Sequence, residues 1–358
     1  MTKLFEPGRI AGLTLANRLV RSATAEYMAD PAGRPEPPMV EMYEALAQGG
    51  VGLIVTGHAF VHPSGRYRLE MTGVYDDDLI PSLEALTKAV HDQGGKVAMQ
   101  INHGGRRCAE DVINQEPLAP SPVPQTRGSP RPRELSETQI RELIGAYSRA
   151  AGRVKAAGFD GVQVHAAHGY LIGQFNSPAA NWRRDGWGGS AARRLRFLEE
   201  IAAAVRDEVG GDYPVLIKLG IQDFVRDGMT LDDGLEIVRH LADWGLDAVE
   251  ISGGLGSQNV RKDILRPDEE AYFLPQARKV RDATDLPLIL VGGLRSQSVM
   301  ERILEEGTAD FISLCRPLIR EPDLPLRFQE GQDKASCISC NRCWPPPGEY
   351  GVKCRAEE

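Results

Sequence analysis

The sequence lacks any long apolar run. No stretch of its 358 residues approaches the ~20 consecutive apolar residues that a bilayer-spanning helix needs. The first ten residues, MTKLFEPGRI, also lack the basic and apolar regions of a secretion signal. These absences exclude a membrane protein, and we expect a cytoplasmic location.

Blocks of one charge sign are missing as well. Lys and Arg total 42 against 50 Asp and Glu, a net charge of -8, and the basic residues are scattered among acidic ones. A nucleic-acid surface needs a concentrated basic patch, so a nucleic-acid partner is excluded and a small-molecule substrate is favoured. With 42% hydrophobic and 26% charged residues, the composition is that of an ordinary globular protein.

Cysteine is rare before residue 337, where only Cys108 and Cys315 occur. The four remaining cysteines follow the spacing C-x2-C-x2-C-x10-C and are Cys337, Cys340, Cys343 and Cys354. In a chain without a secretion signal this spacing favours metal or cluster ligation over disulfides. A [4Fe-4S] cluster, zinc and unligated thiols all remain open, because spacing does not choose among them. We therefore divide the chain into a main domain, 1–330, and a Cys-rich tail, 331–358.

Short apolar runs alternate with amphipathic ones along the main domain. Eight runs have the composition of buried parallel strands: RLVRSA, VGLIVTG, KVAMQI, GVQVH, VLIKL, AVEIS, LILVGG and FISLC. Eight such strand-helix units predict an α/β fold of the closed (β/α)8 TIM-barrel class. An open doubly wound sheet is the alternative, but no Gly-x-Gly-x-x-Gly follows the first strand.

Local signals mark two helix starts and one long excursion. Ser136 precedes Gln139, and Thr230 precedes Asp233, at the spacing of a capping box. The proline- and arginine-rich stretch 104–135 is too long for an ordinary crossover, so we expect it to cover one face of the barrel.

Polar residues and glycines follow the predicted strands, where a barrel of this class builds its active site. In chain order the set is Ser22, Ala23, Thr24, Ala25, Tyr27, Gly57, His58, Gln100, Asn102, His103, His165, His168, Tyr170, Lys218, Ser252, Gly253, Gly254, Gly292, Gly293, Arg295, Cys315 and Arg316. A purely structural barrel would not need polar groups at every strand end.

Two features of this set indicate a phosphorylated ligand. Gly292 and Gly293 allow close backbone approach to an anion, a helix opening near Ser296 would direct its amides toward it, and Arg316 could add a charge-assisted contact. Lys218 lies within an apolar strand and needs an anion or a dipole-rich partner. A tight turn at the glycines and a lysine that reaches solvent are the structural alternatives.

The residues resemble the old yellow enzyme family of FMN-dependent oxidoreductases. LFEPGRIAGLTLANRLVRSAT is similar to the family's opening segment, QINHGGR to its third-strand motif, and HAAHGYLIGQFNSPAANWRRDGWGGS to its fourth-strand signature. VGGL and SLCRPLIREPDL resemble its closing phosphate-binding segments. Together these motifs run from about residue 4 to 325.

The resemblance implies FMN as cofactor, NAD(P)H as reductant and a role for each matching position. The implied cofactor-binding residues are Ser22, Ala23, Thr24, Ala25, His58, Gln100, Lys218, Gly292, Gly293, Cys315 and Arg316. Ser22 to Ala25 would lie along the flavin ring, Gln100 and Lys218 would contact its pyrimidine end, and Gly293, Cys315 and Arg316 would bind the phosphate. The implied catalytic residues are His165 and His168, which would hold the substrate's carbonyl or nitro oxygen, and Tyr170, the proton donor. Tyr27 matches a substrate-facing tyrosine.

The expected reaction is reduction of the C=C bond of an α,β-unsaturated carbonyl or nitro compound. Hydride delivery to the β-carbon places negative charge on the carbonyl oxygen, and two fixed N–H donors would stabilise it as an oxyanion hole does. A tyrosine hydroxyl, with a usual pKa near ~10, could then protonate the α-carbon. One departure is Ala25, which stands where one branch of the family has a cysteine beside the flavin.

The tail resembles 2,4-dienoyl-CoA reductases and trimethylamine dehydrogenases, which carry a cluster next to FMN, although their second domain is absent from this sequence. Association into homo-oligomers is also expected from the family. The residues do not indicate the physiological substrate, nor NADH over NADPH.

Two other functions compete with this interpretation. A metal-dependent barrel hydrolase would use His58, His103, His165 and His168, but Glu250 is the only acid near a strand end, and alternation is expected to point it away from the mouth. A non-catalytic or partner-linked electron-transfer flavoprotein would use the cysteine tail and would not need Tyr170.

Overall fold

Eight parallel strands close into a barrel in the computed structural model, which describes residues 2–255, 269–346 and 349–356. Around the ring their order is β3-β4-β6-β9-β10-β11-β12-β13, with β13 paired back to β3. The bounds are β3 (Leu19–Arg21), β4 (Leu53–Val55), β6 (Val97–Asn102), β9 (Gly161–Ala166), β10 (Val215–Gly220), β11 (Ala248–Ser252), β12 (Leu288–Val291) and β13 (Phe311–Leu314). All eight predicted strands and the TIM-barrel class are confirmed.

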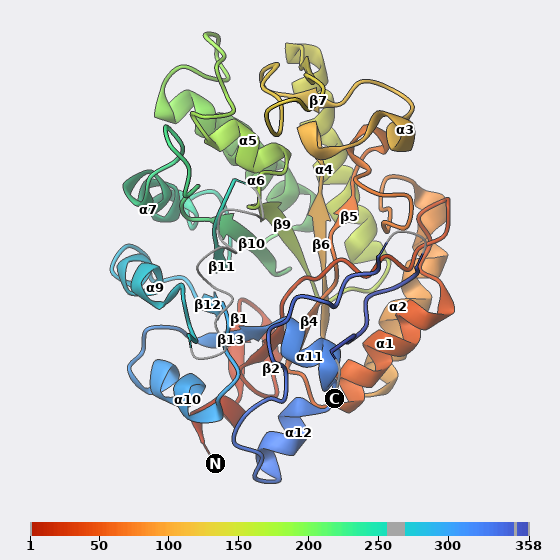
Figure 1. Cartoon of the computed structure of the whole chain (residues 1–358), viewed down its shortest axis with the longest axis vertical. Helices are drawn as coiled ribbons and strands as arrows, with labels where there is room; N and C mark the ends of the chain where they lie inside the picture. The colour runs from red at the N-terminus through yellow and green to blue at the C-terminus, as the bar shows by residue number, and fades with distance from the viewer. Residues whose placement is uncertain (1, 256–268, 347–348, 357–358) are drawn as a thin grey trace.

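Helices surround the strands, as Figure 1 shows. Their bounds are α1 (Pro37–Gln48), α2 (Ile80–Asp92), α3 (Glu110–Ile113), α4 (Glu137–Ala156), α5 (Leu171–Asn176), α6 (Ala191–Val209), α7 (Leu231–His240), α9 (Leu274–Arg281), α10 (Gln297–Glu305), α11 (Arg316–Arg320) and α12 (Leu324–Gln329). Short 3-10 turns lie at η1 (Lys3–Phe5), η2 (Pro63–Gly65), η3 (Asp77–Leu79) and η4 (Gly105–Arg107). Both predicted capping boxes are present, at the starts of α4 and α7. None of the described helices combines the length and apolarity needed to cross a membrane.

A hairpin that the sequence did not indicate precedes the barrel. Strands β1 (Gly8–Ile10) and β2 (Leu13–Leu15) pair antiparallel. Ile10 and Leu15 of this hairpin join barrel residues such as Phe311 in one fully buried apolar cluster. The hairpin therefore packs against the lower interior of the barrel, below the strand ends that form the mouth.

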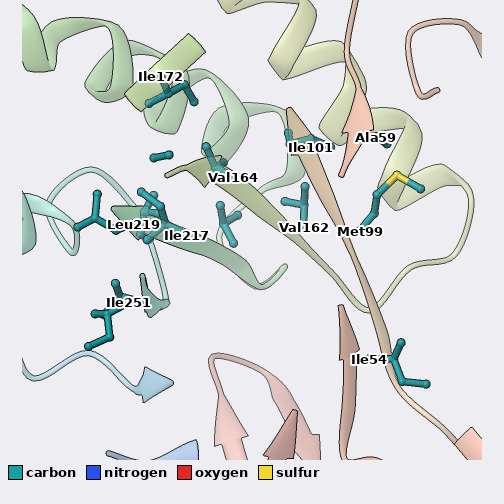
Figure 2. Close-up of a cluster of buried hydrophobic side chains, with 14 of the residues drawn as sticks. Ile54, Ala59, Met99, Ile101, Val162, Val164, Ile172, Ile217, Leu219 and Ile251 are labelled. Atoms are coloured by element: carbon teal, nitrogen blue, oxygen red, sulfur yellow. The ribbon is translucent and has the colours of Figure 1, made fainter. Parts of the chain in front are cut away.

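Side chains alternate along each barrel strand between the helices and the interior. Figure 2 shows the outward set, including Met99, Val162, Ile217 and Ile251, which belongs to the large core cluster. The residues between them face the interior, because successive side chains of a strand point to opposite faces. The interior is apolar near the hairpin and polar one layer higher, so the polar layer borders the mouth.

Two segments extend over the mouth side of the barrel. The excursion 104–135 contains η4, α3 and β7 (Leu118–Ala119), which pairs in parallel with β8 (Arg133–Glu134); β5 (Ala59–Phe60) adds to the edge of β6. The tail returns to the start of the chain, where the Val352 amide donates to the Glu26 carbonyl at 2.8 Å and the Gly351 amide to the Tyr27 carbonyl at 3.2 Å. The tail thus lies beside the segment that follows β3.

Candidate active site

A cavity of about 500 Å³ opens at the carboxyl ends of the barrel strands. Its lining residues lie in or just after each of the eight barrel strands, and among them are Ser22, Ala23, Thr24, Ala25, Tyr27, His58, Gln100, His165, His168, Tyr170, Lys218, Gly292, Gly293, Cys315 and Arg316. Every predicted catalytic, cofactor-binding and substrate residue outside the cysteine tail lines this one cavity. Its volume is typical of sites for small molecules and cofactors.

The floor of the cavity is a buried hydrogen-bonded layer centred on Glu250. Its Oε1 lies 2.7 Å from Lys218 Nζ and accepts hydrogen bonds from Ser22 Oγ at 2.7 Å and Ser313 Oγ at 2.9 Å. Its Oε2 accepts from Gln163 Nε2 at 3.0 Å. Desolvation would raise the pKa of Glu250, but the positive charge of Lys218 and the hydrogen bonds to the carboxylate hold it below its usual value.

The expectation that Glu250 points away from the mouth is wrong. Lys218 and Glu250 are register partners on the neighbouring strands β10 and β11, so both face the barrel interior. The buried lysine therefore has the anion that its apolar strand required. On the other side, Gln100 Nε2 donates to Gln163 Oε1 at 2.7 Å, which extends the layer across the barrel.

The segment Ser22–Ala25 forms one wall. The backbone amide of Ser22 donates to the Leu314 carbonyl at 2.8 Å, and Thr24 Oγ1 lies 2.9 Å from Cys315 Sγ. Arg21, buried behind the segment, donates to the carbonyls of Val55 at 2.7 Å and Thr24 at 3.2 Å. These contacts fix the backbone of the wall to the neighbouring strands.

His165, His168 and Tyr170 form the wall beyond β9. The His165 ring centroid lies 5.1 Å from that of His168 and 5.0 Å from that of Tyr170. His165 Nδ1 is buried without a hydrogen-bond partner among the described residues, whereas His168 Nε2 lies 2.7 Å from Ser252 Oγ. His168 has a φ of 60°, a left-handed conformation that costs a non-glycine residue free energy and is often found at functional sites.

Burial controls protonation at this wall. Desolvation lowers the pKa of His165 well below its usual value, with the neighbouring His168 acting in the same direction, so His165 is neutral at physiological pH. Desolvation raises the pKa of Tyr170, and Arg107 opposes that rise. The tyrosine therefore keeps its proton and can donate it.

His58 lies between the strand ends and Tyr170. Its Nε2 is 3.4 Å from the Tyr170 hydroxyl, and its Nδ1 is 2.9 Å from Asn102 Nδ2. Burial lowers the pKa of His58 to about 3, so it too is neutral. The contacts of His58 are thus with Asn102 and with the rings of Tyr67, His165 and Tyr170.

The opposite end of the cavity is suited to an anion. Gly292 and Gly293 have φ values of 134° and 71°, a region that L-residues rarely adopt, and a Cβ on Gly293 would lie 3.0 Å from the Tyr272 ring. Arg295, which also lines the cavity, has two buried guanidinium nitrogens, Nε and Nη2, without hydrogen-bond partners in the described part of the chain. Arg316 adds a second guanidinium there, held by Asn341 Oδ1 at 2.6 Å.

The helix start at Ser296 does not offer free amides as expected. The amides of Arg295 and Ser296 both donate to Glu270 Oε2 at 2.8 Å, and Ser296 Oγ donates to Glu270 Oε1 at 2.7 Å. The Glu270 carboxylate thus takes the position that sequence reasoning gave to a ligand anion. Anion binding at this end depends on the glycines and arginines.

The cysteine tail borders the same cavity but does not form an evident metal site. Ser339, Asn341 and Trp344 of the tail line the cavity. Burial and then the nearby thiols, Cys315 first among them, raise the pKa of Cys343 to about 12, so the thiols are neighbours. Cys340 is exposed, and Cys354 Sγ accepts from Arg320 Nη1 at 3.4 Å. Over the ranges that the structure describes, no three His, Cys, Asp or Glu side chains are arranged to hold a metal ion.

Several residues in and beneath the cavity were missed or misassigned from the sequence. Gln163 and Glu250 carried a usable signal, because a polar residue inside an apolar strand must find a partner in the barrel. Arg107, which lies over the rings of Tyr170 and Tyr67 at 4.8 and 5.4 Å, carried no such signal. It comes from the excursion after β6, and its direction depends on the folded loop.

The chain matches the family model described as "NADH:flavin oxidoreductase / NADH oxidase family" over residues 3–335. It is 37% identical over 344 residues to an NADH oxidase of Thermoanaerobacter brockii, a match covering 94% of this chain and 52% of that protein. The chain therefore spans about half the length of this relative.

Two solved structures are similar to the fold. One is a 2-naphthoyl-CoA reductase in complex with 2-naphthoyl-CoA, with a TM-score of 0.90 and 29% identity over 95% of this chain and 54% of the other. The second is an old yellow enzyme homologue from Zymomonas mobilis, with a TM-score of 0.78 and 27% identity over 94% of this chain and 95% of the other. The resemblance identified from the sequence motifs is confirmed at the level of family and fold.

Proposed function

This chain belongs to the NADH:flavin oxidoreductase / NADH oxidase family, and we propose that it is an FMN-dependent enzyme that uses NAD(P)H to reduce the C=C bond of α,β-unsaturated carbonyl or nitro compounds. The observation that carries the proposal is the shared cavity. A neutral His165 and a protonated Tyr170 lie on one wall with His168, opposite the glycine and arginine end.

The residues present fit FMN. The glycines at 292 and 293 leave room for a phosphate, and Arg295 and Arg316 supply cations for it. Two Arg295 nitrogens make no hydrogen bond in the described part of the chain, although Nη2 lies 3.9 Å from Glu270 Oε1. The segment Ser22–Ala25, Gln100 and Lys218 would hold the ring. When bound, FMN would supply hydride transfer from the nicotinamide to the alkene.

The chain's own residues would hold the substrate and move its proton. Because His165 Nδ1 has no described partner and the ring is neutral, His165 can orient toward a substrate oxygen, with His168 as the second donor. Tyr170 would deliver its proton to the α-carbon. Lys218 would stabilise negative charge above the floor, at a strength limited by its pair with Glu250.

The test separates the two half-reactions. Tyr170→Phe should slow reoxidation by an enone at least about 10²-fold, in the range of a lost general acid, while reduction by NAD(P)H changes little. Equal losses in both half-reactions would contradict the proton-donor role. A purified protein that releases no FMN on denaturation would refute the flavoenzyme proposal itself.

The cysteine tail supports a second candidate, a partner-linked electron-transfer flavoprotein. Four thiolates are a suitable donor set for a [4Fe-4S] cluster or zinc. The thiols are neighbours but lack a ligating arrangement among the described residues, so we derive no step through a metal here. Iron, zinc and acid-labile sulfide measurements after anaerobic purification test this candidate. The division at residue 330, the cytoplasmic location and homo-oligomerisation stay predictions.

A further inference from the structure

The charged side chains that line the cavity are all positive. Its lining contains five cationic side chains and no Asp or Glu within the described residues; the cations are Arg68, Arg107, Lys218, Arg295 and Arg316. Lys218 is neutralised by Glu250 below the floor, and Arg295 and Arg316 stand at the glycine end. Arg68 and Arg107 have no such explanation.

The glycine end of the cavity and the Tyr170 wall are too far apart around the barrel to bind one phosphate together. Arg316 follows β13, whereas the Tyr170 wall follows β9, which lies four strands away in a ring of eight. Figure 1 shows α11, which begins at Arg316, and α5, which follows Tyr170, on different sides of the strands. A phosphate at the glycine end therefore leaves the charge near Tyr170 available for another group.

Arg107 is positioned against the substrate wall. Its Nη1 donates to the His168 carbonyl at 2.5 Å, and its guanidinium lies 4.8 Å above the Tyr170 ring. Within residues 2–255, 269–346 and 349–356, Arg107 makes no ion pair with a carboxylate, and the groups that act most strongly on its charge are Tyr170, Tyr67 and Tyr27. The nearby tyrosines raise the pKa of Arg107 against desolvation, so it is charged at any working pH. The half-buried guanidinium contacts the His168 carbonyl and the Tyr170 ring and hydrogen-bonds the Tyr67 side chain. Because a guanidinium has five N–H donors, it still has donors for an anion.

Resting on the proposed function, we infer that Arg107 is a specificity-determining residue that binds a carboxylate carried by the alkene substrate. The His165 side of the wall would hold the reacting carbonyl oxygen, and Arg107 would hold the anionic group beyond it. Arg68, whose guanidinium lies 4.9 Å over the Tyr27 ring at the same side, adds to the positive potential there. The site thus selects anionic enones over neutral ones of the same size.

A competing role for Arg107 acts through the tyrosine alone. Its charge opposes the rise in the Tyr170 pKa, so it could tune the proton donor without touching the substrate. That role would affect neutral and anionic ligands alike. The two roles are therefore separable by a matched ligand pair.

The test uses the FMN-loaded protein and two phenols, 4-hydroxybenzoate and 4-methylphenol, whose binding is followed by flavin absorbance. Arg107→Gln should weaken 4-hydroxybenzoate at least about tenfold, equivalent to about 1.4 kcal/mol, and change 4-methylphenol less than about twofold. Arg107→Lys should recover part of the loss. The control Arg239→Gln removes an exposed positive charge at the end of α7 and should change neither ligand.

The pattern of losses decides the inference. A selective loss for 4-hydroxybenzoate, weakened further by salt, supports it. Equal losses for both phenols overturn it in favour of a purely positional role, and no loss for either phenol overturns both roles. A raised KM for NADPH but not NADH, with 4-hydroxybenzoate affinity intact, also overturns it, because Arg107 would then bind the reductant's phosphate. If wild-type protein binds 4-methylphenol and reduces neutral enones without preferring the carboxylate, only this inference fails; if it does neither, the proposed function fails as well.

Discussion

Replacing Glu250 by glutamine removes the only carboxylate within reach of Lys218 among the described residues. The two groups lie 2.7 Å apart with side chains 0% and 4% exposed, so solvent screens them little. An effective dielectric of about 20 gives about 6 kcal/mol of Coulomb energy at that distance. Much of this energy offsets the cost of removing the two charges from water. We therefore expect the free energy of unfolding to fall by about 3–5 kcal/mol, the usual effect of leaving one buried charge unpaired.

A double-mutant cycle isolates the pair. Glu250→Gln, Lys218→Met and the double variant would be compared by urea unfolding of the apoprotein followed by tryptophan fluorescence. Each single change should be costly, and the double should cost at least about 2 kcal/mol less than their sum. Asp92→Asn, which breaks the exposed pair with Lys88, is the control and should cost below about 1 kcal/mol. Additive single effects would refute the buried ion pair.

Three further predictions concern acid stability, cofactor binding and a helix cap. Burial lowers the pKa of His58 and His103 to about 3 and that of His165 well below 6.5, so these rings stay neutral while the unfolded chain takes up protons. The stability that depends on these neutral rings is thus fully present above pH ~6.5. The free energy of unfolding should fall by up to about 4 kcal/mol per pH unit between pH 6.5 and 5, and a free energy from urea unfolding that does not change with pH would contradict this. Asn341→Ala should raise the Kd of FMN about tenfold, because it removes the hydrogen bond that holds the Arg316 guanidinium at the cavity. Flavin fluorescence titration measures this Kd. Ser136→Ala should cost about 1 kcal/mol in thermal or urea unfolding, because it removes the capping box of α4.

The barrel could be predicted because its signals are local. Each strand is a short apolar run that lies next to an amphipathic stretch, and two of these stretches have their own start signals, at Ser136 and Thr230. The β1–β2 hairpin was missed because its strands are three residues long, and such runs do not show a period. The motifs also placed His165, Tyr170 and the two glycines around one cavity.

The errors concern contacts between residues distant in sequence. Glu270 caps the start of α10 from a position 26 residues earlier, and no local pattern indicates that contact. Glu250 was assigned to the wrong face although it shares the register of Lys218 on the next strand. Strand pairing, once considered, would have placed both residues in the barrel, since register fixes which face a side chain occupies.

The polar layer beneath the cavity is best understood as a requirement of the site. One layer lower the same interior is filled by apolar residues such as Leu216 and Ile289, so the fold itself does not need polar groups inside the barrel. A buried ion pair is often no more stabilising than well-packed aliphatic side chains. The pair of Lys218 and Glu250 borders the cavity, where a fixed charge distribution favours chemistry that develops charge. We therefore expect Lys218→Met combined with Glu250→Leu to unfold at a urea concentration close to that of the wild type, yet to bind FMN weakly. A double variant that is unstable but binds FMN normally would show that the layer serves folding.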